Sequence, residues 1–227
     1  MAHCHIDHIV ITAPSLKRGE DFVSRELGVQ PQAGGEHPRM GTHNLLLRLG
    51  GSMYLEVIAP NPSAAQPMRP RWFELDKLTS DSEPRLATWI ARTQDIHTTR
   101  TTITESLCEI EQMIRGSLQW LITIPADGCM PLGGLAPSLI EWQSEVHPAS
   151  TLLEKACSLE RLELFHPDPI VISAILESLG LSESVHASAC SPHMSPFLVA
   201  HIRTPTGLRR IGPHNPPLTS DSTATVC

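Results

Sequence analysis

Apolar positions recur with strand-like and helix-like spacing in three successive passes along the 227-residue chain. The first pass predicts a β-branched strand at 6–12, a helix at 16–27 that ends at Gly28, and strands at 44–49 and 52–58. Gly50-Gly51 separates the last two strands, which is typical of a hairpin. A loop rich in Gly, Pro and His is expected at 30–42, so the first sixty residues predict a strand, a helix, and two or three further strands.

The same order of elements begins again at residue 86. The pattern there predicts a strand at 86–92, a helix at 93–107, a strand at 118–124, a Gly/Pro loop at 125–137 and a last strand at 138–142. A third pass predicts a strand at 159–164, a helix at 168–179 capped by Asp168, and strands at 185–189, 197–203 and 208–211. The tail, 213–227, has few apolar residues and is predicted to be disordered.

The three passes can be aligned at the junction between the first strand and the helix. A first-strand position then holds His8, Thr88 and Arg161, and a last-strand position holds Glu56, Glu141 and, in the third pass, an arginine at 209 or 210. Similar lengths of chain separate the two positions in all three passes, which indicates an internal repeat. We therefore expect βαβββ units at 1–62, at 85–148 after a loop insertion at 63–84, and at 157–212.

Composition and charge narrow the class of partner. An apolar fraction of 41% with 18% charged residues is ordinary for a globular protein. The formal net charge of −7, with no basic run longer than the pair at 209–210, argues against binding of nucleic acid or an anionic membrane. No apolar run reaches the ~18 residues of a membrane span, and the N-terminus lacks the pattern of a signal peptide.

The six cysteines are scattered, without a CxxC or another close pair. This pattern predicts free thiols rather than a disulfide scaffold or a zinc site. We therefore expect a cytoplasmic protein whose partner is a small molecule, with a homodimer as a further possibility.

Several motifs are specific enough to point to a family. The opening IDHIVI carries His8, and HPRMGTHN, YLEVIAP, RPRWF and PLGGLAPSLIEW follow at 37–44, 54–60, 69–73 and 131–142. With the βαβββ repeat, they resemble the vicinal-oxygen-chelate superfamily, and more narrowly a bacterial group of glyoxalase-like domains, over residues 5–212. The resemblance implies an α+β fold in which βαβββ modules form the open barrel shared by glyoxalases, bleomycin-resistance proteins and dioxygenases. The third C-terminal half-module would be structural, covering a sheet edge or building an interface.

The resemblance also implies a metal site. In the superfamily, one residue from the first and one from the last strand of each module bind a divalent cation. Carried over by position, these are His8 and Glu56, then Thr88 and Glu141, of which the threonine hydroxyl is a poor ligand. One imidazole and two carboxylates suit Zn, Ni, Mn or Mg with open positions. Such a metal could stabilise an enolate or enediolate while Glu141 or Glu56 moves the proton, as in a lyase or isomerase.

Two alternative functions stay open. The first is a metal-free protein that binds and sequesters a small molecule, as bleomycin-resistance proteins do, and Thr88 favours it. The second is an extradiol dioxygenase, which normally needs two histidines and one carboxylate, so Thr88 counts against it. His8 can alternatively be a hydrogen-bonded core residue, and Glu56 and Glu141 can face solvent from edge strands.

Other polar and aromatic residues are candidate contacts of the small molecule. Those in RPRWF offer cations and aromatic faces suited to an acidic or planar ligand, although Trp72 and Phe73 can instead pin the loop to the barrel. His43 can alternatively cap a strand, and His37 can be solvated. The candidates are His37, His43, Asn44, Arg71, Trp72, Thr88, Trp142 and His147.

Overall fold

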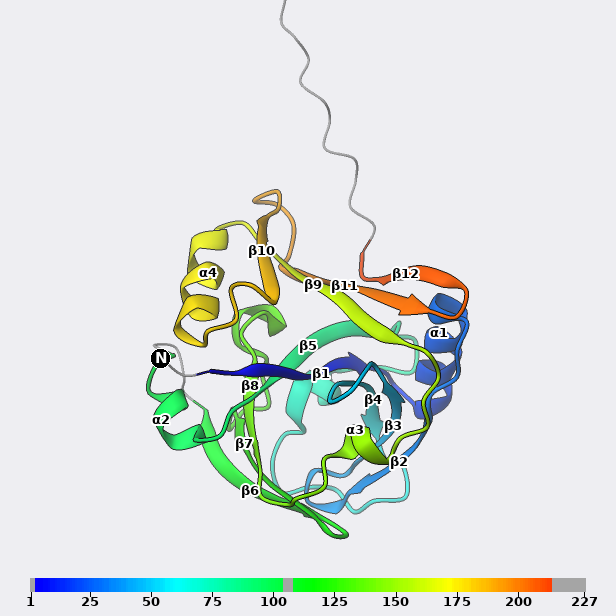
Figure 1. Ribbon diagram of the computed structural model, residues 1–227. Coiled ribbons are helices and arrows are strands. Elements are labelled where there is room, and N and C mark those ends of the chain that lie inside the picture. The colour runs from blue at the N-terminus through cyan, green and yellow to red at the C-terminus, as the bar shows by residue number, and fades with distance from the viewer. Residues whose placement is uncertain (1–2, 104–107, 214–227) are drawn as a thin grey trace, which may run out of the picture.

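Two strand–helix–three-strand units form one curled, eight-stranded sheet (Figure 1). The computed structural model describes residues 3–103 and 108–213 of the chain. The first unit consists of β1 (His5–Thr12), α1 (Leu16–Leu27), β2 (Gln32–His37), β3 (Thr42–Arg48) and β4 (Tyr54–Pro60). The second consists of β5 (Arg85–Arg92), α2 (Ile96–Arg100), β6 (Glu109–Arg115), β7 (Leu118–Ile124) and β8 (Ser138–Trp142). The strand order is β2-β3-β4-β1-β5-β8-β7-β6, a mixed α+β half-barrel, and the predicted fold class is confirmed.

The first strands of the two units lie side by side at the centre of the sheet. β1 runs parallel to β4 and β5 runs parallel to β8, whereas β1 and β5 pair antiparallel. In this central pair His8 lies opposite Ile90, and Val10 lies opposite Thr88. When each unit is superposed on the other, the pair of His8 with Ile90 maps onto the pair of Thr88 with Val10. His8 and Thr88 therefore hold equivalent positions, in agreement with the repeat alignment.

The second unit departs from the prediction between residues 93 and 117. Its helix α2 spans only Ile96–Arg100, and 104–107 of the predicted helix lie outside the described residues. Four threonines at 98–102 explain the short helix, because β-branched residues have low helix propensity. Strand β6 was not predicted, because its buried side carries Glu111 and Met113 while Ile114 is 60% exposed. A buried glutamate and an exposed isoleucine therefore hide the hydrophobic alternation of this strand.

Strand β2 also lies in a segment predicted to be a loop. Its two central residues are Gly34 and Gly35, and the pairing with β3 shifts between Ala33 and Glu36. A glycine-rich, irregular strand has no apolar alternation, so the pattern of residues 30–42 could not reveal it.

The third unit follows the predicted order of elements but not the pairing of the other two. It consists of β9 (Ser158–His166), α4 (Pro169–Ser178), β10 (Val185–Ala189), β11 (Phe197–Thr204) and β12 (Gly207–Ile211). Its sheet has the order β10-β9-β11-β12, with β9 parallel to β10 and antiparallel to β11. In the barrel units the first strand instead pairs with the last, so the third unit does not repeat their half-site.

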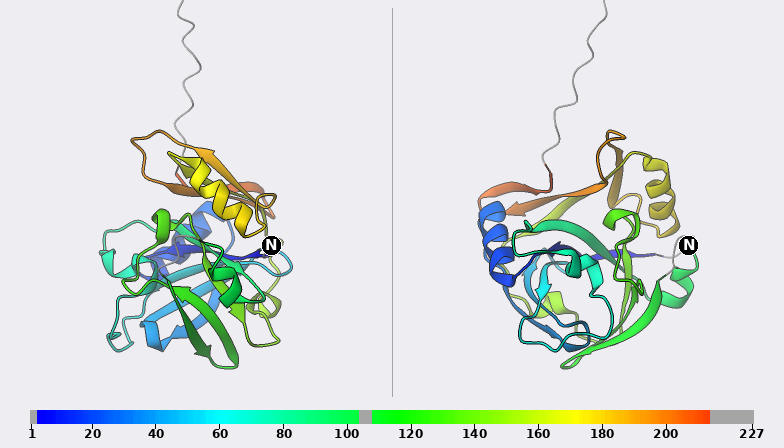
Figure 2. Two further views of the ribbon diagram at one scale, coloured as in Figure 1. Left: turned by 90° about the vertical axis from the view of Figure 1, so that its left-hand side faces the viewer. Right: turned by 180° about the vertical axis from the view of Figure 1, so that it is seen from behind.

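This third unit packs on the outer face of the barrel (Figure 2). β11 contacts β5 and the short helix η3 (Pro131–Gly134), and β12 contacts α1. A single apolar core extends from Ile9 and Trp89 of the central strands to Leu164, Ile175 and Leu198 of the third unit. The three units therefore form one folded body. No helix within the described ranges is long and apolar enough to cross a membrane.

Candidate functional site

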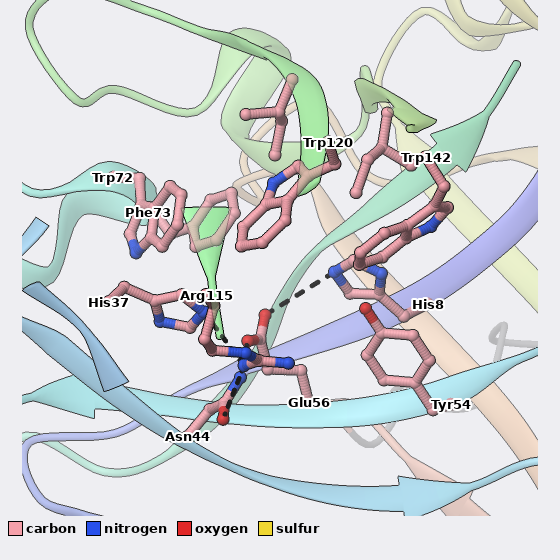
Figure 3. Close-up of a pocket in the computed structure, with 12 residues that line it drawn as sticks. His8, His37, Asn44, Tyr54, Glu56, Trp72, Phe73, Arg115, Trp120 and Trp142 are labelled. Atoms are coloured by element: carbon pink, nitrogen blue, oxygen red, sulfur yellow. Dashed lines mark hydrogen bonds and ion pairs between the residues drawn. The ribbon is translucent and has the colours of Figure 1, made fainter. Parts of the chain in front are cut away.

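A cavity inside the curl of the sheet gathers part of the predicted site (Figure 3). Six predicted residues line it: His8, His37, Asn44, Glu56, Trp72 and Trp142. Its free volume is about 30 Å³, enough for one or two water molecules. Polar side chains form one side of this inner cavity, and aromatic rings form the other.

A bulge in β1 brings two neighbouring polar residues together. Ile6 lies opposite Ala91 and His8 lies opposite Ile90, so Asp7 is an extra residue between two strand pairs. Neighbours in a regular strand point to opposite faces, but a bulge redirects one of them. As a result, Asp7 Oδ1 lies 2.6 Å from His8 Nδ1, although Asp7 is fully buried.

Asp7 connects β1 to the end of the second unit. Its Oδ2 accepts a hydrogen bond from Trp142 Nε1 at 2.9 Å and lies 2.9 Å from His147 Nε2. Burial alone would raise the pKa of Asp7, but the hydrogen bonds from His147 and His8 outweigh it and hold that pKa far below its usual value. Asp7 is therefore an ionised residue that fixes the orientation of three rings.

His8 and Glu56 face each other across the inner cavity. His8 Nε2 lies 3.6 Å from Glu56 Oε2, and Asn44 Nδ2 donates to Glu56 Oε1 at 2.5 Å. Burial opposes the charge on His8, but the hydrogen bond to Asp7 and the ion pair with Glu56 raise its pKa to about 9. Burial also opposes the charge on Glu56, whose ion pair with His8 lowers its pKa to about 2. At neutral pH the Asp7 carboxylate, the His8 imidazolium and the Glu56 carboxylate therefore lie in a row.

Arg115 closes the gap where the two edges of the curled sheet meet. From β6 its Nη1 lies 3.2 Å from His37 Nε2 on β2 and 3.4 Å from Asn44 Oδ1. Gly35 allows this approach, since a Cβ there would lie 2.9 Å from Arg115 Cδ. Burial, with Arg115 adding to it, lowers the pKa of His37 to about 4, so His37 is a neutral acceptor. Within the described part of the chain, Arg115 has no carboxylate ion-pair partner.

The aromatic side of the inner cavity comes from three separate elements. Trp72 and Phe73 of η2 (Trp72–Lys77) stack with ring centroids 5.5 Å apart. Trp120 of β7 and Trp142 of β8 lie 5.3 Å apart. The Trp72 side chain is 4% exposed, so it both lines the cavity and anchors its loop.

Ion pairs hold the loop that carries η2 in place. Arg69 and Arg39 both pair with the buried Glu111 of β6. Arg71, predicted as a ligand contact, pairs with Asp76 and donates from Nε to the Gly41 carbonyl at 3.2 Å. The structure therefore places Arg71 in loop anchoring and not in the lining of the inner cavity.

Glu141 does not join His8 and Glu56. Its neighbours Ile140 and Trp142 both line the inner cavity, so strand alternation turns Glu141 to the other face. Its Oε2 accepts a hydrogen bond from the Ile96 backbone at 2.8 Å, which places it beside α2.

Strand register identifies Ser138 as the equivalent of Glu56. Glu56 pairs with Val10 of β1, and Ser138 pairs with Ile90, the equivalent of Val10, in β5. The repeat alignment therefore chose the wrong residue of β8, because the loops before β4 and β8 differ in length.

The second half of the site thus consists of two hydroxyl groups. Thr88 and Ser138 line a separate cavity of about 10 Å³, behind Trp72 and Phe73. Thr88 Oγ1 donates to the Gly134 carbonyl at 3.0 Å, so its hydrogen is committed to the backbone.

These residues do not fit a divalent metal. Only His8 and Glu56 remain together from the expected ligand set, and the Arg115 guanidinium lines the same cavity. Nowhere in 3–103 or 108–213 do three or more His, Cys, Asp and Glu side chains gather in a way that could hold a metal ion. A dioxygenase would need a second histidine at the position that Thr88 occupies. The residues that line the cavity beside Thr88 include no histidine.

Two further predicted contacts lie outside the inner cavity. His43 is next to Asn44 in β3 and, by alternation, points to the opposite face of the sheet. His147 follows β8 and caps α3 (Pro148–Thr151), with its ring 5.9 Å from that of Tyr54. It acts on the cavity through Asp7 rather than from its lining.

Four residues of the site were missed from the sequence: Asp7, Tyr54, Arg115 and Trp120. Arg115 could have been found, because a third βαβββ strand was due between residues 108 and 117 in the second unit. Trp120 lies within the strand that was predicted at 118–124. Tyr54 could have been found from alternation, two residues before Glu56 in β4, where it stacks on His8 at 4.4 Å. No sequence signal revealed Asp7, whose position depends on the bulge.

The curled pair of βαβββ units around a central cavity defines a vicinal-oxygen-chelate protein. More narrowly, the chain belongs to the glyoxalase-like domain family, whose model matches residues 6–180. No curated protein matches the chain in sequence.

Comparison with solved structures finds similarity at low sequence identity. A hypothetical protein from Staphylococcus aureus is 16% identical, with a TM-score of 0.54 over 92% of this chain and 85% of that one. Methylmalonyl-CoA epimerase from Mycobacterium tuberculosis is 14% identical, with a TM-score of 0.39 over 60% and 85%. A variant of the Streptomyces coelicolor epimerase in complex with 2-nitronate-propionyl-CoA is 16% identical, with a TM-score of 0.41 over 65% and 99%.

Proposed function

We propose that the protein binds a small planar organic anion in the inner cavity without a resident metal. The observation that carries this proposal is Arg115, a guanidinium beside aromatic rings whose charge has no carboxylate partner among the described residues. The one carboxylate lining the cavity, Glu56, already forms an ion pair with His8 and accepts a hydrogen bond from Asn44. A ligand carboxylate can therefore pair with Arg115 while its planar part stacks on the rings.

Access to the inner cavity requires side-chain movement. Its free volume of about 30 Å³ is below that of an organic molecule. Arg115 and Trp142 are the half-buried members of its lining, and both reach solvent. We expect these two side chains to move when ligand enters, because the rings of η2 are held by the ion pairs of Arg69 and Arg71.

The geometry supports binding better than proton transfer. A general base works best when its pKa lies near the working pH. The pKa of Glu56 is about 2, because the ion pair with His8 and the hydrogen bond from Asn44 favour its ionised form over the effect of burial. Such a carboxylate is a weak base towards a C–H group, so lyase or isomerase chemistry through Glu56 is disfavoured.

Calorimetric titration with benzoate, cyclohexanecarboxylate and acetate tests the proposal. We expect benzoate to bind most tightly, because only it combines a carboxylate with a planar ring. Arg115→Gln should weaken benzoate binding by about tenfold to a hundredfold, the loss expected for a charged hydrogen bond. Arg25→Gln removes an equal charge from exposed helix surface and should have no effect. Equal affinity of wild type and Arg115→Gln would contradict the proposal.

A metal titration separates this proposal from a metal-dependent lyase or isomerase. Protein purified without chelators should contain no stoichiometric divalent metal, and Zn²⁺, Ni²⁺ or Mn²⁺ should not raise its Tm. A rise in Tm that disappears in both His8→Gln and Glu56→Gln would overturn metal-free binding and favour the enzyme. His43→Gln, on the outer face of β3, is the matched histidine control.

A further inference from the structure

A second, much larger hollow lies between the barrel and the third unit. It has a free volume of about 520 Å³, which is typical of sites for small organic molecules. Its walls come from the start of β1, the turn between β3 and β4, strand β9, and the segment leading into β10. An adjoining hollow of about 530 Å³ shares two of its lining residues, His5 and Arg92. We call these two joined hollows the outer cleft.

Arg92 is the central cation of the outer cleft. It ends strand β5 directly opposite His5 of β1, and its side chain is 26% exposed. Its closest side-chain acceptors are Ser52 Oγ at 3.5 Å and Asp7 Oδ2 at 4.0 Å. Asp7 is already bonded to His8, Trp142 and His147, so the Arg92 guanidinium keeps donors free to face the cleft.

The other charges of the outer cleft largely cancel in pairs. Arg161 pairs with Glu163 at 2.7 Å, and Glu160 pairs with Arg203 at 3.0 Å. Glu183 and Glu141 are the acidic residues of the lining without an ion pair among the described residues. Glu183 enters from the third unit, whereas Glu141 lines the adjoining hollow, where it accepts hydrogen bonds from the Ile96 backbone at 2.8 Å and from Gln143 Nε2 at 2.6 Å.

We propose that the outer cleft binds a small anionic molecule whose phosphate or carboxylate group pairs with Arg92. A guanidinium offers two parallel N–H donors that match either group. Ser52, Ser184 and His186, which line the same hollow, supply hydroxyl and imidazole partners for the rest of the molecule. The larger hollow has walls from both the third unit and the barrel, and it shares no lining residue with the inner cavity. The adjoining hollow shares Trp142 with the inner cavity.

Calorimetric titration with inorganic pyrophosphate and with citrate tests this site on the full chain. We expect at least one of the two anions to bind. Tighter binding of pyrophosphate identifies phosphate as the preferred group, and tighter binding of citrate identifies carboxylate. Arg92→Gln should lower the affinity at least tenfold, whereas Arg209→Gln, which removes an equal charge from exposed β12, should not change it. Arg115→Gln should also leave it unchanged, which distinguishes this site from the inner cavity.

Two further variants keep the test decisive if Arg92→Gln fails to fold because Arg92 lies near Asp7. Ser184→Asp adds a negative charge at an exposed lining position and should weaken anion binding severalfold. Glu183→Gln removes a repelling charge and should strengthen it. The proposal would be overturned if neither pyrophosphate nor citrate binds. It would also be overturned if the affinities do not respond to Ser184→Asp and Glu183→Gln.

Discussion

His8 combines two conditions that normally oppose each other, near-complete burial and a positive charge. Its ring is held between Asp7 and Glu56, and these two carboxylates outweigh the cost of desolvation. The row carries one net negative charge, and on its outer side Arg92 Nε lies 4.0 Å from Asp7 Oδ2. An imidazolium fixed in this way is a structural cation, and it leaves Arg115 as the cation available to a ligand.

The raised pKa of His8 predicts how stability depends on pH. In the unfolded chain His8 loses its proton near pH 6.5, whereas in the folded protein it keeps it until about pH 9. Its contribution is therefore complete below pH 6.5 and is lost as the pH rises to 9. The free energy of unfolding in urea should fall over this range by an amount on the order of 1–3 kcal/mol.

Two variants control the pH experiment. The pKa of His43 is lowered, mainly by its partial burial, so it does not titrate in the folded protein above pH 6.5. His43→Gln should therefore keep the wild-type decline, and His8→Gln should flatten it. A wild-type profile that stays flat from pH 6.5 to 9 would show that His8 is not held as a cation.

At the scale of elements, the sequence predicts those whose buried side is apolar. Strand β1 and helix α1 were placed to within a residue, because their apolar spacing matches the period of each element. Strand β6 was missed because ion pairs let it bury Glu111, which no hydrophobic pattern can show. Asp7 and Ser138 were missed for another reason. The side-chain direction of Asp7 depends on a bulge in β1, and the register of Ser138 depends on the length of the loop before β8. Neither feature leaves a periodic signal in the sequence.

The glycines of β2 allow a test at this scale. A Cβ at Gly34 would overlap Asn44 Oδ1, the atom that accepts from Gly35 N. Gly34→Ala should therefore displace Asn44 from Glu56 and lower the free energy of unfolding by about 1–3 kcal/mol. Gly51→Ala meets no atom within 4 Å and should change it by less than about 0.5 kcal/mol in the same urea experiment. Equal stability of the two variants would show that Asn44 can move freely.

At the scale of the whole molecule, the repeat predicted the barrel but not the role of the third unit. That unit was expected to cover a sheet edge or build an interface. It covers the outer face of the two central strands rather than a sheet edge. Ile9 and Trp89 are fully buried there, and Cys4 N donates to the Leu179 carbonyl at 3.1 Å. Ile9 and Ile11 of β1 therefore face the third unit while His8 faces the inner cavity, so β1 is buried on both sides.

This arrangement predicts that the barrel does not fold alone. A chain ending at residue 156 would expose Ile9, Trp89 and Leu135, whose burial contributes roughly 1.5–3 kcal/mol each. Their sum is comparable to the ~5–15 kcal/mol that stabilises a whole domain. We expect this chain to lose its near-ultraviolet circular dichroism and its cooperative melting. A chain ending at residue 213 keeps every described contact and should melt like the full protein. A shorter chain that melts cooperatively within a few degrees of it would show that the barrel is an independent domain.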